Sequence, residues 1–280
     1  MKIGKAIDEG NLCLKNKKIK SFLIESELLI SKAMNKKREY IILNQDKEIN
    51  LDEYSIFKKM IYERSKGKPI AYLLGKKYFW KNEFEVNESV LIPRPDTEVI
   101  IEEVLNIYKN KNKINFLDIG VGSGTIILSI LNEKKQFFGT GIDLSAGCLS
   151  VCRKNAHKFK VNDRLKLFKS DIDNFSWGKY DLIISNPPYI NKLDFNKLDK
   201  DIKYFEPFLA LDGGLDGLSE IRKIINKATE LIKKNGRLIL EIAFNQKNDV
   251  KKILMKKGFF IEAVVQDLAK NDRCIVSRKI

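Results

Sequence analysis

The spacing of apolar positions changes near residue 75 of this 280-residue chain. Before that point, apolar side chains recur at helical intervals with charged residues between them, as in Ser21–Ile30 and Asp52–Tyr62. Gly67-Lys68-Pro69 then supplies a helix stop. The pattern predicts a small bundle of helices over residues 1–74.

Aromatic and polar residues alternate in the stretch that follows the predicted bundle. Tyr78-Phe79-Trp80 and Glu83-Phe84-Glu85-Val86 flank Lys81-Asn82, which predicts a β-hairpin. We assign residues 75–92 to this hairpin. It is expected to link the bundle to a second domain over residues 93–280.

Short apolar runs and helical patterns alternate through this second domain. Asp96, which follows Pro93-Arg94-Pro95, is expected to N-cap its first helix. The predicted strands are 115–119, 137–142, 164–169, 180–185 and 236–242, with helices between them, and then 259–266 and 273–278 with no helix between. The alternation predicts an α/β fold with a doubly wound, mostly parallel sheet, and the closing pair predicts a hairpin at its edge. Ligands of such sheets bind beyond the carboxyl ends of the strands.

One of these strand ends carries an unusual tetrapeptide. Asn186-Pro187-Pro188-Tyr189 directly follows the apolar run Tyr180–Ser185. Proline fixes its own φ and restricts the residue before it, so Asn186 and Pro187 are held extended. The Asn186 side-chain oxygen and the Pro187 carbonyl can then each accept one hydrogen of a planar NH2 group, with Tyr189 as a flat wall. The alternative is an ordinary strand exit, because proline often follows strands.

A glycine-rich turn follows another predicted strand. Gly120-Val121-Gly122-Ser123-Gly124 joins the strand 115–119 to a helix. Alternating glycines let the backbone turn sharply and approach a ligand closely, with helix N–H groups exposed to it. The next strand ends in Asp143, whose carboxylate can accept both hydroxyl hydrogens of a ribose. The glycine spacing departs from that of pyrophosphate sites and favours the S-adenosylmethionine site of class I methyltransferases.

Several segments carry a resemblance to one protein family. They are Gly67–Gly75, Val90–Glu98, Leu117–Gly124, Ser185–Ile190, Phe205–Pro207, Leu211–Gly217 and Asp267–Arg273. On these segments the chain resembles the HemK/PrmC family of glutamine N5-methyltransferases, which modify peptide chain release factors. The likeness spans almost the whole chain. The Ile-Pro-Arg-Pro-Asp-Thr-Glu segment and the double-glycine run are more particular to this family than Asn-Pro-Pro-Tyr is.

The resemblance implies an activity, a fold and a partner. The implied enzyme transfers methyl from S-adenosylmethionine to the side-chain amide nitrogen of the glutamine in the Gly-Gly-Gln (GGQ) loop of class 1 release factors, which supports translation termination. The implied catalytic domain has a seven-strand, Rossmann-like sheet. The implied role of the N-terminal helices is to bind the release factor, although from the sequence alone they could equally be a structural cap.

The resemblance also implies roles for individual residues. The catalytic set is Asn186, Pro187 and Tyr189, and the substrate-binding set is these three residues with Pro188. The cofactor set is Gly120, Val121, Gly122, Ser123, Gly124, Asp143, Asp171, Ile172 and Asn186, with Asp171 facing the adenine and Ile172 beside it. The family often has tryptophan where Ile172 stands, and Trp177 is a candidate replacement; glycine is usual where Ala243 stands.

Three residues of the segment Val90–Glu98 are open to two interpretations. Arg94, Thr97 and Glu98 match the family motif and would line the same cleft as the tetrapeptide. The alternative is that they cap a helix and dock one domain on the other. The sequence favours neither.

The charge of the chain is strongly positive. Lysine and arginine number 52 against 37 acidic residues, a formal net charge of +15. Such a balance suits nucleic acid or a partner bound to nucleic acid. The charges are dispersed, however, and runs such as Lys15–Lys20 and Lys36–Arg38 are more often solvated helix ends. We therefore expect that direct binding of nucleic acid is not essential.

The cysteine spacing and the hydropathy of the chain bear on metal binding, disulfides and membrane insertion. Cys13, Cys148, Cys152 and Cys274 have neither metal-site spacing nor a disulfide framework. Cys148 and Cys152 share a helix face near His157 but are expected to pack as small apolar residues, so no metal is expected. No apolar run approaches the roughly eighteen residues of a membrane span. The start of the chain has no signal-peptide pattern, so a cytoplasmic protein is expected. We also expect a monomer.

Rival functions use the same slot. An adenine-N6 DNA methyltransferase, or an enzyme acting on guanine in RNA, would also grip an exocyclic amine, but such enzymes usually need a further domain for base readout and flipping. A closer variant would methylate glutamine on a ribosomal protein. A non-catalytic module that binds S-adenosylmethionine or nucleic acid is the alternative from another class, although a mere binder gains nothing from an acceptor slot.

Overall fold

The computed structural model describes residues 1–280 and divides into two compact units. The first consists of Met1–Lys76 with Asp199–Phe205, and the second of Lys77–Leu198 with Glu206–Ile280. Each unit has a hydrophobic core of its own. The assignment of residues 199–205 to the first unit has no counterpart in the sequence pattern.

The first unit is helical, as the apolar spacing predicted. Its helices are α1 (Ile3–Asn16), α2 (Phe22–Ala33), α3 (Arg38–Leu43), α4 (Leu51–Ser65), α5 (Ile70–Leu74) and α9 (Lys200–Phe205). Their apolar sides enclose a core that includes Leu14, Leu29 and Phe57. Helix α4 begins with a capping box, in which Asn50 and Glu53 each accept the other's backbone N–H.

Arg64 ties α9 to the other helices of this unit through ion pairs with two carboxylates. Arg64, near the end of α4, donates from Nε to Glu25 Oε2 on α2 at 2.6 Å. Its Nη1 donates to Asp201 Oδ2 on α9 at 2.9 Å. A guanidinium is costly to bury without partners, so both carboxylates are needed where Arg64 lies. None of the helices combines the length and apolar character that a membrane span requires.

The predicted hairpin is present, but its turn lies one residue earlier than expected. Strands β1 (Lys76–Phe79) and β2 (Asn82–Glu85) are joined through Trp80 and Lys81. Trp80 takes a φ of +54°, a conformation that a large side chain adopts only when its surroundings hold it there. Its backbone N–H donates to Glu98 at 2.7 Å, and its indole N–H donates to Glu133 at 2.8 Å. These tertiary contacts, rather than turn residues, set the position of the turn.

A seven-stranded sheet forms the centre of the second unit and confirms the predicted fold class. The strands are β3 (Asn115–Ile119), β4 (Phe138–Asp143), β5 (Leu165–Lys169), β6 (Tyr180–Ser185), β7 (Ile232–Glu241), β8 (Phe259–Gln266) and β9 (Asp272–Lys279). Their order is β5-β4-β3-β6-β7-β9-β8. Neighbours from β5 to β7 are parallel, whereas β9 is antiparallel to both β7 and β8, as predicted for an edge hairpin.

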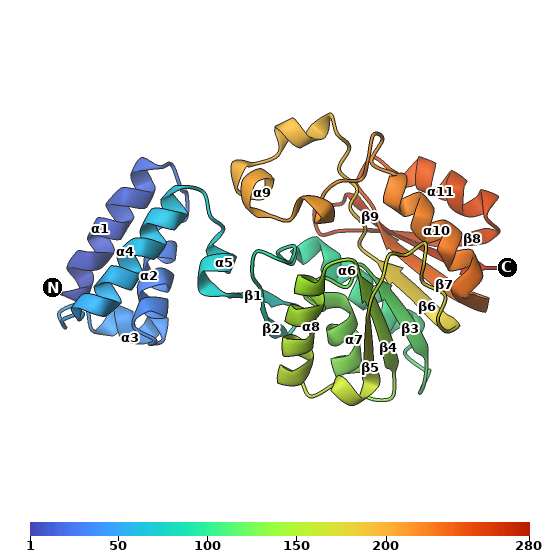
Figure 1. The fold of residues 1–280 in the computed structure, drawn as a ribbon, viewed down its shortest axis with the longest axis horizontal. Helices are drawn as coiled ribbons and strands as arrows, with labels where there is room; N and C mark the ends of the chain where they lie inside the picture. The colour runs from blue at the N-terminus through green and yellow to red at the C-terminus, as the bar shows by residue number, and fades with distance from the viewer. The chain divides into compact units, whose positions relative to one another are not determined.

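Helices cover both faces of this sheet (Figure 1). They are α6 (Glu98–Ile107), α7 (Thr125–Glu133), α8 (Ala146–Lys158), α10 (Ser219–Leu231) and α11 (Lys247–Lys256). Phe116 and Ile184 enter the core beneath α6, α7 and α8, whereas Leu117 and Ile183 enter the core beneath α10 and α11. Side chains of a strand alternate between faces, so strands covered on both sides are apolar throughout. Cys148 and Cys152 are buried, as predicted.

The helix that opens the second unit does not begin at Asp96, so the prediction that Asp96 is its N-cap is wrong. A 3₁₀ turn over Pro95–Thr97 precedes α6, and Thr97 occupies the N-cap position. Asp96 is exposed, and its carboxylate lies 3.5 Å from the Arg273 guanidinium. Pro95 suits the first position of such a turn because its φ is already fixed, so the turn starts before the acid can cap the helix.

Gly124→Ala is expected to lower the free energy of unfolding more than Gly120→Ala does. Both glycines have positive φ (+86° and +76°), which costs an L-residue about 1 to 2 kcal/mol. A Cβ on Gly124 would also lie 2.7 Å from Cys152 and Leu128, whereas one on Gly120 would meet nothing within 4 Å. We expect an additional loss of about 1 to 3 kcal/mol for Gly124→Ala, measured by chemical denaturation without ligand. Equal losses would contradict this packing.

Candidate active site at the carboxyl ends of the strands

Two adjacent strand ends bring the glycine-rich turn and the tetrapeptide together. In the parallel pair β3 and β6, Ile119 is in register with Ser185. The next residues are Gly120 on one strand and Asn186 on the other. Neighbouring strands lie about 4.8 Å apart, and the Ser185 hydroxyl also donates to the Ile119 carbonyl at 2.7 Å. The two motifs therefore start side by side at one edge of the sheet.

The glycine-rich turn requires the glycines that form it. Gly120, Gly122 and Gly124 all have positive φ. The N–H groups of Gly120 and Val121 both donate to the Ile142 carbonyl at the end of β4, at 2.9 and 3.0 Å. Gly120 is exposed, with open space where its Cβ would be. The turn is thus anchored from below and accessible to a ligand above Gly120.

Asp143 is part of the same turn as well as a candidate ribose ligand. Its Oδ2 accepts the Gly122 N–H at 2.9 Å, and its Oδ1 accepts the Ser145 N–H at 2.8 Å. Each carboxylate oxygen can accept a second hydrogen bond. Asp143 can therefore hold the turn and still accept hydroxyl hydrogens, and its role toward a ribose stays a prediction.

The two residues proposed for the adenine side lie beyond the end of β5. Asp171 does not end a strand, since β5 ends at Lys169; its Oδ1 instead accepts the Asp173 N–H at 2.9 Å. Ile172 is buried and packs in the core beneath α10 with Ile142 and Phe175. Their roles toward adenine stay predictions.

The acceptor atoms of the tetrapeptide are free within the protein. Asn186 is half-buried, and its Nδ2 donates to Thr97 Oγ1 at 3.2 Å. This bond uses the donor end of the amide and leaves Oδ1 without a partner. The Pro187 carbonyl likewise accepts no hydrogen bond from the chain. Neither of the two oxygens on which the slot depends is therefore used in a hydrogen bond within the protein.

The backbone of the tetrapeptide is held by a loop that closes around Tyr189. Cβ atoms on Gly213 and Gly217 would lie 2.8 Å from Tyr189 Cα and 2.5 Å from its carbonyl oxygen, so only glycine fits this loop. Gln246 Nε2 donates to the Tyr189 carbonyl at 3.2 Å and to the Gly217 carbonyl at 3.0 Å. Gln246 could not be predicted from the sequence, because its contribution is visible only once these carbonyls are brought together.

Arg94 and Glu98 hold neighbouring segments rather than the slot. Arg94 pairs with Glu206 at 2.5 Å. Glu206 also accepts the Ile92 N–H at 3.2 Å, and Glu98 accepts the Trp80 N–H. Of the three motif residues whose role was left open, only Thr97 has its side chain bonded to the tetrapeptide.

Two buried carboxylates were not assigned roles from the sequence. Asp118 is 1% exposed beside the first turn of α7, and neither of its oxygens makes a hydrogen bond of ordinary geometry. Glu241 is equally buried, its Oε2 has no partner, and its Oε1 accepts the Tyr189 hydroxyl at 3.4 Å. Burial raises the pKa of each to about 7. The sequence signal for these two residues was an acidic residue within an otherwise apolar strand, because ionisable groups with shifted pKa values cluster at functional sites.

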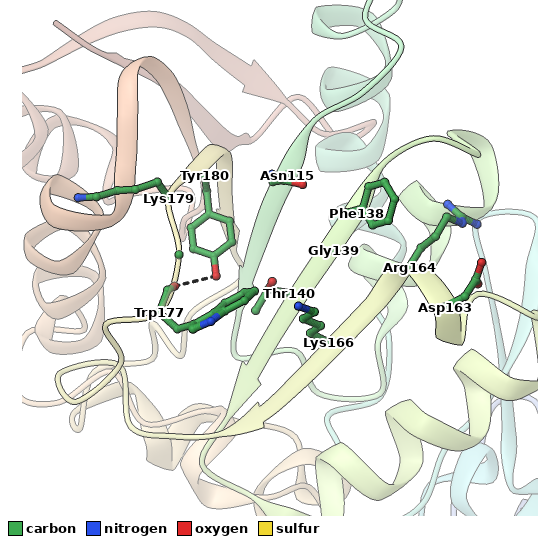
Figure 2. Close-up of a pocket in the computed structure, with 11 residues that line it drawn as sticks. Asn115, Phe138, Gly139, Thr140, Asp163, Arg164, Lys166, Trp177, Lys179 and Tyr180 are labelled. Atoms are coloured by element: carbon green, nitrogen blue, oxygen red, sulfur yellow. Dashed lines mark hydrogen bonds between the residues drawn. The ribbon is translucent and has the colours of Figure 1, made fainter.

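A cavity of about 280 Å³ lies at the amino ends of the strands, opposite the candidate site (Figure 2). Its lining includes Asn115, Phe138 and Tyr180, which begin β3, β4 and β6. Trp177 also lines it, with Lys166 Nζ 4.6 Å from the ring centroid. Trp177, the candidate replacement for the tryptophan usual at position 172, thus lines this cavity, and its role toward adenine stays a prediction. Because ligands of parallel sheets bind at the carboxyl ends, this cavity is not the predicted site.

The fold and this arrangement define a Rossmann-like methyltransferase with an N-terminal helical domain. Residues 5–75 match the PrmC N-terminal domain family, and residues 97–203 match the methyltransferase small domain family. A solved methyltransferase from Pyrococcus furiosus shares the fold with a TM-score of 0.53 and 18% identity, over 70% of this chain and 88% of that one.

The chain belongs to the release factor glutamine methyltransferase family. It is 36% identical to the protein of that name from Clostridium botulinum, over 97% of each chain. It is 34% identical to that of Caulobacter vibrioides, over 91% of this chain and 89% of the relative. A protein named bifunctional methyltransferase from Rickettsia bellii is 35% identical over 98% of this chain, which spans 54% of that relative. The family identified from sequence motifs is thereby confirmed.

Asp118→Asn is expected to stabilise the protein at high pH. The pKa of Asp118 is higher in the folded than in the unfolded chain, so the stability it confers when protonated is present below about pH 4 and is lost as pH rises through about 7. At pH 8 the variant should gain about 1 to 4 kcal/mol in unfolding free energy, and this gain should shrink toward pH 4. Denaturation at several pH values measures it, with the exposed Asp163→Asn as the control for loss of one charge. A gain that does not change with pH would contradict the assignment.

Proposed function

We propose that this protein transfers a methyl group from S-adenosylmethionine to the side-chain amide nitrogen of the glutamine in the GGQ loop of class 1 release factors. The observation that carries the proposal is the pair of free oxygens on Asn186 and Pro187, directly beside the turn that starts at Gly120. The names of the relatives support the choice of substrate.

The residues around the turn fit S-adenosylmethionine. Gly120 has open space above it, and Asp143 retains acceptor capacity for ribose hydroxyls. We propose that the residues from Gly120 to Gly124, with Asp143, hold the cofactor, and that Asp171 and Ile172 lie toward its adenine. When bound, the cofactor supplies an electrophilic methyl group.

The slot formed by Asn186, Pro187 and Tyr189 would compensate for the weak nucleophilicity of an amide nitrogen. The nitrogen lone pair of a carboxamide is delocalised into its carbonyl, so the protein must orient the nitrogen. Asn186 Oδ1 and the Pro187 carbonyl accept the two amide hydrogens, and Tyr189 stacks on the amide plane. As the new N–C bond forms and the S–C bond breaks, the nitrogen becomes positive, so both acceptors bind the transition state more tightly than the ground state. One amide proton then leaves to solvent.

The helical unit is the proposed site of release-factor binding. It contains the residues that match the PrmC N-terminal domain family. The proposal retains the sequence-based expectations of a cytoplasmic monomer that needs no nucleic acid for its action. A slot for a planar NH2 group would equally accept adenine or guanine, so the substrate must be identified by experiment.

Incubation with labelled S-adenosylmethionine and either a release factor or DNA distinguishes these substrates. We expect label in the release factor, and mass spectrometry to place one methyl on the GGQ glutamine. Label in DNA, or binding of DNA that depends on salt without any methyl transfer to protein, would favour the rival functions.

Asn186→Ala is expected to reduce kcat by about a hundredfold or more, because it removes one of two acceptors aimed at the developing positive charge. The affinity for S-adenosylmethionine, measured by calorimetry, should fall far less than kcat, although Asn186 also belongs to the implied cofactor set. Asn226→Ala, at an exposed asparagine on α10, is the matched control and should leave kcat unchanged. Weakened cofactor binding with an unimpaired kcat would show that Asn186 has a different role.

A further inference from the structure

The acceptor role of Asn186 depends on which end of its side-chain amide is available. The oxygen and the NH2 group of an amide have nearly the same shape but opposite hydrogen-bonding character. Only the oxygen end can accept from a substrate NH2 group. Because Nδ2 is bonded to Thr97, the amide is held with its oxygen end free. The contacts of Thr97 therefore decide whether the slot accepts or donates.

Thr97 does not use its hydroxyl in the way usual for its position. It is the N-cap of α6, where threonine generally accepts a hydrogen bond from a helix N–H, yet it makes no such bond. Its side chain is 4% exposed, so it cannot turn to solvent. The hydroxyl instead accepts from Asn186, and Thr97 also lies near enough to the Glu241 carboxylate to lower its pKa.

Glu241 fixes the direction of these hydrogen bonds. It ends β7, where Leu240 is in register with Ser185 of β6. An ionised carboxylate accepts hydrogen bonds and cannot donate them. We therefore expect the Thr97 hydroxyl to point its hydrogen toward Glu241, which leaves its lone pairs to accept from Asn186. The Tyr189 hydroxyl donates to the same carboxylate, so a single buried charge orders both functional side chains of the slot.

We propose that Thr97 and Glu241 are positioning residues that present the oxygen end of Asn186 to the substrate amide. This proposal rests on the proposed function, because that function supplies the substrate amide from which Asn186 accepts a hydrogen bond. The opposite direction of the Thr97–Asn186 hydrogen bond would prevent binding of the substrate amide. If the Thr97 hydroxyl donated to Asn186, the Asn186 amide would have to flip. The NH2 end of Asn186 would then face the NH2 group of the substrate, and two donors cannot pair.

The charge state of Glu241 is expected to control this order. Burial raises the pKa of Glu241 to about 7, the Thr97 hydrogen bond and Arg273 oppose the rise, and Asp96 adds to it. The other titratable groups that face Glu241 are Tyr189 and Cys274, whose pKa values burial also raises, so both stay neutral. Protonated Glu241 becomes a donor and no longer requires the Thr97 hydrogen. The amide of Asn186 should then lose its fixed direction as pH falls through about 7.

Thr97→Val and Thr97→Ser separate the hydrogen bond from the packing. Valine keeps the shape of threonine without the hydroxyl, and serine keeps the hydroxyl. At pH 8, with a release factor as substrate, we expect Thr97→Val to lower kcat by about tenfold to a hundredfold with little change in the Kd for S-adenosylmethionine. Thr97→Ser should retain most of the activity. Equal losses in the two variants would overturn the proposal, since packing alone would then explain them.

Glu241→Gln tests whether the Glu241 carboxylate fixes the direction of the hydrogen bonds to Thr97 and Asn186. Glutamine is similar in size but both donates and accepts, so it does not enforce one order. In the wild-type enzyme kcat should fall as pH drops from about 8 to about 6, and in Glu241→Gln this acid limb should be absent. An unchanged acid limb in the variant would assign the ionisation to another group and overturn the role of Glu241.

A spectroscopic measurement separates this proposal from the proposed function. With ¹⁵N-labelled asparagine, the side-chain NH2 signals of Asn186 can be followed without substrate, using Asn186→Asp to assign them. We expect them to shift as pH crosses about 7 in the wild type and in Thr97→Ser, but not in Thr97→Val. If these shifts occur and no release factor is methylated, only the proposed function fails. If methylation occurs and Thr97→Val matches the wild type in both measurements, only the positioning network fails.

Discussion

The site depends on the register between β3 and β6. Pairing of Ile119 with Ser185 sets the glycine-rich turn and the tetrapeptide one strand spacing apart. A shift by one residue would also reverse which side chains of β6 enter each core, so two hydrophobic cores oppose it. The position of the acceptor slot is therefore fixed by the apolar residues of the strands, far more strongly than by the polar residues of the site itself.

Burial of two carboxylates near this edge works against stability. Asp118 and Glu241 each lack enough partners to stay ionised without cost, which is why burial raises the pKa of both. Hydrophobic residues of similar size would pack more favourably at both positions. Their presence is understandable if both serve the proposed site: Asp118 belongs to the strand that leads into the glycine-rich turn, and Glu241 is the proposed positioning residue behind the slot.

Much of the sheet and the outline of the site could be predicted from the sequence because they depend on local signals. Apolar runs predicted the strands, and prolines and alternating glycines predicted the strand exits. Features set by contacts between distant segments could not be predicted. The turn at Trp80 depends on Glu98 and Glu133, and the segment 199–205 joins the helical unit through Arg64. The sequence left open whether Trp177 replaces the residue usual at position 172, because sequence proximity does not place a loop residue at a given end of the strands.

The network behind the slot also gives a reason for asparagine, rather than aspartate, at position 186. Aspartate would offer oxygens of the same geometry, but it has no N–H to donate to Thr97. It would also place a second negative charge one hydroxyl away from Glu241, and neighbouring carboxylates raise each other's pKa. One of the two would then be protonated near neutral pH, and a protonated acid can present a donor to the substrate amide. A neutral side chain whose donor end is already bonded avoids this, because its remaining oxygen can only accept.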